Sequence, residues 1–171
     1  IWIYKAAILA TGNAKVTIEG TGGSGVSSAN GVALQGAGTR VTAVNGDITI
    51  EGHGGLAATG SFNRGVGVFE GTLIQSTGSG AINLIGFGGG GNVARGVELG
   101  SSGANITQVL SATGDISITG QGGSTNGNGD STGVIVHSGT VIESTATASI
   151  TIDGTGGSGS FSNEGVDFNG Y

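Results

Sequence analysis

Two histidines and two repeat-related glutamates are the side chains in this 171-residue sequence whose types suit chemistry. His53 stands between two glycines, whereas the residues around His137 do not suggest a catalytic triad. Glu19 and Glu51 both lie in Thr-Ile-Glu-Gly segments, so stacking of these segments would bring two carboxylates together. Such a pair could bind Ca²⁺, because calcium prefers oxygen ligands.

The residues at equivalent positions of the other segments favour a structural interpretation. The position of His53 is occupied elsewhere by residues of mixed chemistry, namely Thr21, Phe87, Gln121 and Thr155. At the position of Glu19 and Glu51, the other segments have Ile85, Thr119 and Asp153, so a negative charge is not constant there. Segments 22–30 and 156–164 also lack the aspartate of the calcium-binding nonapeptide repeat. We therefore predict no catalytic, cofactor-binding or metal-binding residue, and calcium binding by Glu19 and Glu51 stays an open alternative.

Two arginines and a few large apolar side chains are predicted to face outward. Arg64 and Arg95 each directly precede the glycine of a Gly-Val pair, where we interpret them as surface charge. The large residues at outward positions are Trp2, Phe69, Phe87 and Ile135. A patch of such residues would favour lateral association of chains.

The composition argues against several classes of protein. The sequence holds 40 glycines and no proline, cysteine or methionine, and 9% of its residues are charged, against about 25% in an average domain. Low charge with 36% hydrophobic residues favours a folded chain over a disordered one. The net charge of −6 argues against a nucleic-acid partner, which needs clustered positive charge. No apolar run approaches the roughly 18 residues of a membrane helix.

An internal repeat must position the side chains named above. Glycine pairs end five similar segments, with steps of 32, 34, 34 and 34 residues, at 22–23, 54–55, 88–89, 122–123 and 156–157. A Gly-Val pair follows each of them, at 31–32, 65–66, 96–97, 133–134 and 165–166. A third, looser apolar segment comes next, as at 73–74, 106–110 and 141–142. A period of this length is typical of solenoids, in which equivalent segments stack.

The segments before the glycine pairs alternate with a period of two and are rich in β-branched residues, which predicts strands. One column would face a core: Val16, Ile48, Ile82, Ile116 and Ile150. Its neighbour is polar: Thr17, Thr49, Asn83, Ser117 and Thr151. The predicted fold is all-β, a parallel β-helix or β-solenoid of about five coils of 32–34 residues with three short strands each. We expect 1–171 to be one uncapped segment of a longer chain or fibre.

The repeats resemble the glycine-rich coils of filamentous-haemagglutinin-like proteins, the very large secreted β-solenoids of bacterial surfaces. The resemblance extends over 13–171, and segments 47–55 and 149–157 carry it most closely. It implies a right-handed β-helix at the cell surface. Gly52-His53-Gly54 is also similar to the Gly-His-Gly of polygalacturonase-type glycoside hydrolases, but such enzymes need several carboxylates around the scissile bond, and the sequence has no adjacent Asp pair.

Three functions follow as expectations from the repeats and from this resemblance. The first is a non-enzymatic structural component of a bacterial extracellular fibre, sheath or adhesin stalk, in which stacked coils form a stiff, protease-resistant rod. Its partners would be copies of itself, head-to-tail or lateral, or further coils of the same chain. The alternative is an adhesin module that binds surface glycans through the variable loops 24–30, 56–64 and 124–132. An enzyme acting on polysaccharide is the third, and no cofactor is expected for any of them.

Overall fold

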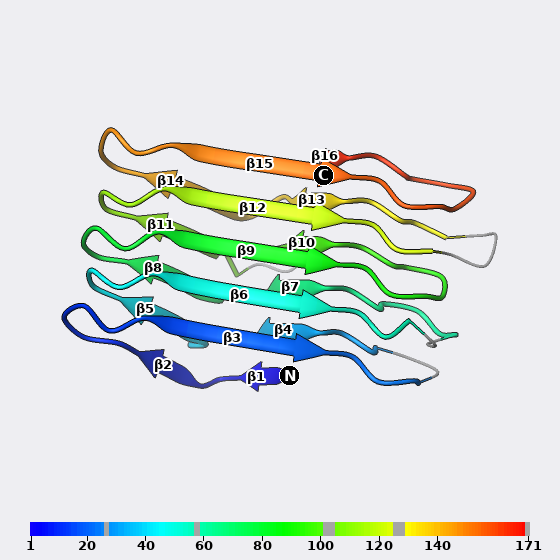
Figure 1. Cartoon of the computed structure of the whole chain (residues 1–171), viewed down its shortest axis with the longest axis horizontal. Helices are drawn as coiled ribbons and strands as arrows, with labels where there is room; N and C mark the ends of the chain where they lie inside the picture. Colours follow the sequence, from blue (N-terminus) through cyan, green and yellow to red (C-terminus); the bar gives the residue numbers. More distant parts are fainter. Residues whose placement is uncertain (26–27, 57–58, 101–104, 125–128, 170–171) are drawn as a thin grey trace.

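The computed structural model describes residues 1–25, 28–56, 59–100, 105–124 and 129–169. In this part of the chain all regular structure is β, and the strands form three parallel sheets wound as a β-solenoid (Figure 1). The chain starts in the bottom coil of that view and ends in the top coil. The predicted fold of about five coils with three strands each is confirmed.

The three sheets are named here in the order in which the chain first enters them. The first sheet has the order β1-β4-β7-β10-β13-β16, with bounds Trp2–Tyr4, Val32–Gln35, Val66–Phe69, Val97–Leu99, Val134–His137 and Val166–Asn169. The second sheet has the order β2-β5-β8-β11-β14, with bounds Ala7–Leu9, Arg40–Ala43, Leu73–Ser76, Thr107–Ser111 and Thr140–Ser144. The third sheet has the order β3-β6-β9-β12-β15, with bounds Val16–Thr21, Ile48–His53, Ile82–Phe87, Ile116–Gln121 and Ile150–Thr155.

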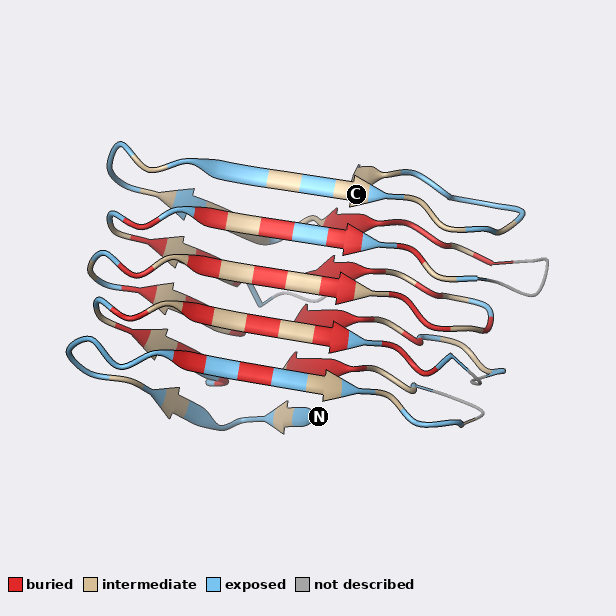
Figure 2. Cartoon of the chain, in the orientation of Figure 1, coloured by how far each residue is buried: buried red, intermediate tan, exposed pale blue. Residues whose placement is uncertain are grey.

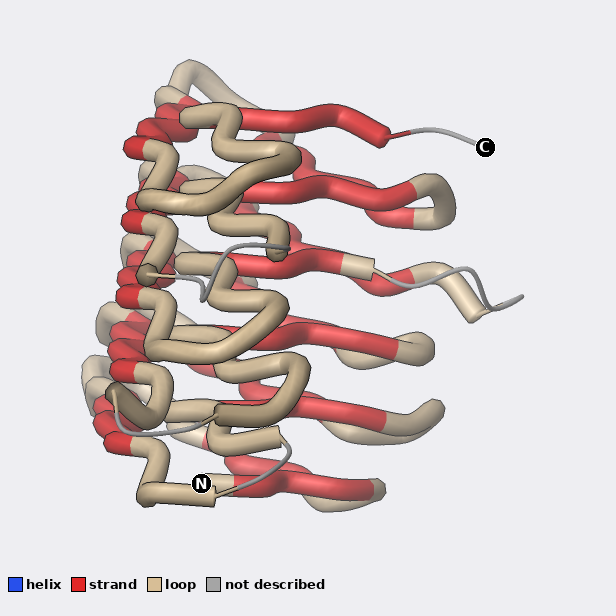
Figure 3. Tube along the Cα trace, turned by 90° about the vertical axis from the view of Figure 1, so that its right-hand side faces the viewer, coloured by secondary structure: helices blue, strands red, loops and turns tan. Residues whose placement is uncertain are grey.

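The register places equivalent residues of successive coils directly beside each other. In the third sheet Ile48 pairs with Ile82, which in turn pairs with Ile116. The predicted polar column is in register as well, because Thr49 pairs with Asn83. Parallel strands lie about 4.8 Å apart, so each coil adds that rise to the stack seen from the side in Figure 3.

One hydrophobic core runs along the inside of the solenoid, between the three sheets. The alternation of apolar and polar residues decides which side chains enter it, because neighbouring residues of a strand point to opposite faces. Ile48, Ile50 and Leu84 are among its fully buried members. Figure 2 shows the resulting alternation of buried and less buried residues along the strands of the third sheet. The predicted core column is confirmed for the coils of β3 to β12, and Ile150 in β15 is exposed.

Backbone contact between the third and first sheets explains the periodic glycines. A Cβ atom on Gly120, at the end of β12, would lie 2.1 Å from the carbonyl oxygen of Gly133 at the entry to β13. Real side chains do not reach such distances, so the two strands approach this closely only because glycine stands there. The corner loops that join these sheets face the viewer in Figure 3.

A buried asparagine ties three coils together on this side of the solenoid. Asn63 is fully buried, and its side-chain Nδ2 donates to the carbonyl oxygens of Gly60 and Gly90. Its Oδ1 accepts a hydrogen bond of 3.0 Å from the backbone N–H of Ala29. These bonds satisfy backbone groups that a corner would otherwise leave unpaired.

Candidate functional site

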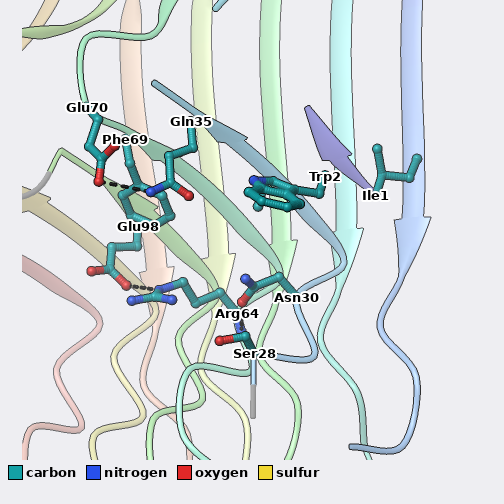
Figure 4. Close-up of a pocket in the computed structure, with 10 residues that line it drawn as sticks. Ile1, Trp2, Ser28, Asn30, Gln35, Arg64, Phe69, Glu70 and Glu98 are labelled. Carbon is teal, nitrogen blue, oxygen red and sulfur yellow. Dashed lines mark hydrogen bonds and ion pairs between the residues drawn. The ribbon is translucent and has the colours of Figure 1, made fainter. Parts of the chain in front are cut away.

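A pocket of about 630 Å³ opens on the outer face of the first sheet. Ligand sites of small molecules commonly enclose about 300–1,000 Å³. Strands β1, β4, β7 and β10 and the segments that flank them provide its lining (Figure 4). We call it the outer pocket, and its lining residues are Ile1, Trp2, Ser28, Asn30, Ala33, Gln35, Arg64, Phe69, Glu70 and Glu98.

Small residues in one outward column create the pocket. Trp2 pairs in register with Ala33, and Ala33 with Gly67. The Trp2 side chain is large and 70% of the residue is exposed, whereas its two neighbours along the stack are small. Both small residues are buried, so the gap lies between the larger side chains that surround them. The ring of Phe69 lies over Gly67, where a Cβ atom would be 2.4 Å from the ring. The gap is therefore bordered by one aromatic side chain on each side along the solenoid axis.

Hydrogen bonds fix the polar groups that surround this gap. Gln35 Nε2 donates to Glu70 Oε1 at 2.9 Å, across two neighbouring coils. Asn30 Oδ1 accepts a bond of 3.1 Å from the backbone N–H of Arg64. The Arg64 guanidinium in turn lies over the ring of Phe69, 5.0 Å from its centroid. Because each group is held by the fold, the polar rim of the pocket is organised in advance of any binding.

A cluster of buried charges lies at the side of the pocket formed by β10. Glu98 accepts a hydrogen bond from Arg64 Nε and forms an ion pair with Arg95 at 2.7 Å. Arg95 also donates through Nε to Asp130 at 2.9 Å. The side chains of Arg64, Arg95 and Glu98 are only 12%, 15% and 6% exposed. We call Arg64, Arg95, Glu98, Asp130 and His137 the charge cluster, and it links three successive coils.

The charge cluster keeps Glu98 ionised. Burial alone raises the pKa of this carboxyl, but the hydrogen bond with His137 and the charges of Arg64 and Arg95 outweigh it and lower the pKa to about 2. For Arg95, burial lowers the pKa, and the charges of Glu98 and Asp130 reverse this and raise it. Both residues therefore carry full charge across the physiological range.

The interpretation of Arg64 and Arg95 as surface charge is wrong. Both arginines point back over the outer face of the first sheet, where the outward column provides Glu98 as a shared partner. A buried ion pair needs this close geometry, because the attraction must offset the loss of hydration of both charges. The two arginines therefore contribute to contacts between neighbouring coils.

His137 belongs to the same cluster and not to a catalytic triad among the described residues. Its Nε2 lies 3.0 Å from Glu98 Oε1, and its side chain is 10% exposed. Its Nδ1 has no hydrogen-bond partner in the part of the chain that the structure describes. The ring thus positions Glu98 from the coil above.

His53 lies on the outer face of the third sheet, as predicted. Its side chain is 46% exposed, and its ring stacks on that of Phe87 with centroids 4.6 Å apart and an interplanar angle of 10°. His53 Nε2 lies 2.9 Å from Glu51 Oε1. Two shallow hollows of about 450 and 400 Å³ flank this stack and share Leu56, Phe87 and Gly88.

Glu19 and Glu51 pair in register, so the predicted proximity of their backbones is confirmed. Glu51 faces His53 as its partner. Within the described ranges, no three histidine, aspartate or glutamate side chains gather closely enough to hold a metal ion.

The large outward side chains do not form one patch. Trp2 and Phe69 line the outer pocket, and Phe87 lies on another sheet. Phe69 and Ile135 are buried although they belong to outward columns of the first sheet, and the Arg64 guanidinium lies over the ring of Phe69. These residues therefore do not form the patch that would favour lateral association of chains.

Neither Glu98 nor the outer pocket is predicted from the sequence. The outward column of Glu98 runs Ala33, Gly67, Glu98, Ile135 and Asp167, so no repeated chemistry marks it. A signal was present all the same. Two arginines at equivalent positions of neighbouring coils, next to a column with a single glutamate, predict an ion-pair cluster once the coils are aligned.

The chain matches no known protein family, no curated protein and no solved structure. No helix in the described part of the chain has the length and apolar character that crossing a membrane requires.

Proposed function

We propose that this chain is a non-enzymatic structural component of a bacterial extracellular fibre, sheath or adhesin stalk. The observation that carries the proposal is the unbroken register of all three sheets along the solenoid. Each inner strand is hydrogen-bonded on both sides, and one core runs through the coils, so bending the rod would break many contacts at once. The resemblance to filamentous-haemagglutinin-like repeats supports the extracellular setting.

The partners proposed for this role are copies of the same chain or further coils. Strands β3 and β15 each have a neighbour on one side only within the described residues. Such edges offer unpaired backbone groups to another parallel strand. A contact between a first and a last coil is head-to-tail, and contacts of that kind extend into filaments.

Glu98 is not suited to act as the proton donor of a glycoside hydrolase. Acid catalysis of glycoside cleavage needs a carboxyl group with a raised pKa. Glu98 is held by three basic side chains and has a pKa of about 2, so it has no proton to give at neutral pH. The buried charges bind the coils together, which suits a structural role.

Electron microscopy of the native assembly tests the structural function. We expect straight, unbranched fibres, and a mass by light scattering far above the 16.3 kDa of one chain. Discrete globular particles of one chain's mass, without fibres in native material, would contradict the proposal.

A second candidate function, an adhesin module that binds surface glycans, is favoured by one specific observation. The outer pocket takes Ser28 and Asn30 from loop 24–30 and Arg64 from loop 56–64, and Asp130 of loop 124–132 supports the charge cluster. The described parts of all three loops proposed for recognition therefore contribute to one region, while residues 26–27, 57–58 and 125–128 of these loops lie outside the described residues. Saturable glycan binding that is lost when these loops are replaced would establish this function.

A further inference from the structure

We propose that the outer pocket binds one uncharged pyranose ring of a glycan, stacked on Trp2 on the side that faces Phe69. This inference rests on the second candidate function and names the site and the class of sugar. It follows from the shape of the gap, from the groups around it and from their charge.

The shape of the gap fits one ring. Trp2, Ala33 and Gly67 stand on successive strands, so the strands that carry Trp2 and Phe69 are separated by two spacings, about 10 Å in all. Stacked rings lie about 4.5–5 Å apart at their closest, so one ring fits between two aromatic side chains at that separation. In the view of Figure 4, Trp2 lies on one side of the pocket, and Phe69 and Glu98 lie on the other.

The groups around the gap suit a sugar and not an aromatic ring. Gln35 lies along one edge of the pocket, and Asn30 and Ser28 lie along the opposite edge (Figure 4). Amide and hydroxyl groups both donate and accept hydrogen bonds, as the hydroxyls of a pyranose require. A purely aromatic ligand would remove these groups from water without offering them partners, which costs free energy. A pyranose presents C–H groups to the face of Trp2 and hydroxyls to the rim.

The charge of the pocket selects against acidic sugars. The guanidinium of Arg64 is already paired with Glu98. Glu70, the other carboxylate in the lining, is hydrogen-bonded to Gln35 and has no cationic partner among the described residues. Glu70 is therefore a carboxylate of the lining without a cationic partner in the described part of the chain, and it would repel the carboxylate of a uronic acid placed beside it.

Calorimetric titration of the whole chain tests this inference. The probes are neutral oligosaccharides of glucose, galactose, mannose and N-acetylglucosamine, and oligogalacturonate as the acidic counterpart. We expect saturable binding of at least one neutral probe, and we expect Trp2→Ala and Gln35→Ala each to weaken it about tenfold. Phe161→Ala is the matched control, because Phe161 is an exposed aromatic residue outside the pocket. Melting temperatures verify that the variants stay folded.

A variant of Glu70 tests the effect of charge in the pocket. Glu70→Gln removes the unpaired carboxylate, and we expect it to narrow the difference between neutral and acidic probes. Binding of a neutral probe that Trp2→Ala and Gln35→Ala leave unchanged would overturn the site but keep the adhesin function. Tighter binding of oligogalacturonate than of every neutral probe would overturn the proposed sugar class. Absence of binding to all probes would overturn both, and fibre imaging would still decide the structural function separately.

Discussion

Removal of the buried negative charge at Glu98 provides a quantitative test of the charge cluster. The substitution Glu98→Gln keeps the size of the side chain but leaves Arg64 and Arg95 without their shared partner. The difference between the ordinary pKa of 4.5 and the value of about 2 corresponds to about 3 kcal/mol of stability near neutral pH. Losses of about 3–5 kcal/mol are typical when one member of a buried ion pair is removed.

Chemical denaturation measured against pH is the appropriate assay. The pKa of Glu98 is lower in the folded chain, so its contribution is fully present above pH 4.5 and is lost as the pH falls through 2. We therefore expect the gap in unfolding free energy between the native chain and Glu98→Gln to be widest near pH 7 and to shrink in acid. Glu143→Gln is the control, because Glu143 is an exposed residue of β14, and a change within about 0.5 kcal/mol is expected there. Equal stability of the two variants at pH 7 would refute the reasoning.

Three further substitutions test the core, a corner and the buried asparagine. Ile116→Asp places a charge in the core, and we expect the free energy of unfolding to fall by more than about 3 kcal/mol. The control Ser117→Asp lies on the outer face and is expected to be tolerated. An unchanged melting temperature of Ile116→Asp would mean that the inward face is misassigned. Gly120→Ala places a Cβ atom against the Gly133 carbonyl and should prevent cooperative folding. The control Gly23→Ala, whose Cβ meets open space, should melt like the native chain. Comparable melting temperatures of the two variants would contradict the corner geometry. Asn63→Ala leaves the backbone groups bonded by this buried amide without partners, and it should lower the free energy of unfolding in urea by about 2–3 kcal/mol. Asn163→Ala, at the equivalent exposed position, should lower it by about 0–1 kcal/mol. The reverse order would argue against the role of Asn63.

The fold was predictable from the sequence because the repeat leaves one consistent arrangement. Alternation at a period of two defines the inward residues, and stacking at 32–34 residues then fixes the register, as the pairing of Ile48 with Ile82 illustrates. The glycine pairs mark the ends of the repeated segments. The structure adds the contact of third and first sheets at Gly120 and Gly133, which local sequence does not reveal.

The charge cluster and the outer pocket were not predicted because they depend on residues that break the repeat. Glu98, Ala33 and Gly67 share a column but no chemistry, so each looks like random variation at an outward position. Only their alignment in space shows that two small residues form a gap and that one glutamate serves two arginines. In a repeat protein, columns of mixed size therefore merit attention as candidate sites.

Cysteine cross-linking tests the central claim, the in-register stacking of successive coils, most directly. The chain contains no cysteine, so a pair can be introduced without competing thiols. Thr49 and Asn83 pair in register on the outer face of the third sheet, and paired Cα atoms of adjacent parallel strands fall within the roughly 4.4–6.8 Å that a disulfide spans. We expect the double variant Thr49→Cys with Asn83→Cys to form an intramolecular disulfide on mild oxidation, and Thr49→Cys with Ser117→Cys, two coils apart, to form none. Efficient cross-linking of the second pair, or failure of the first in the folded chain, would contradict the solenoid.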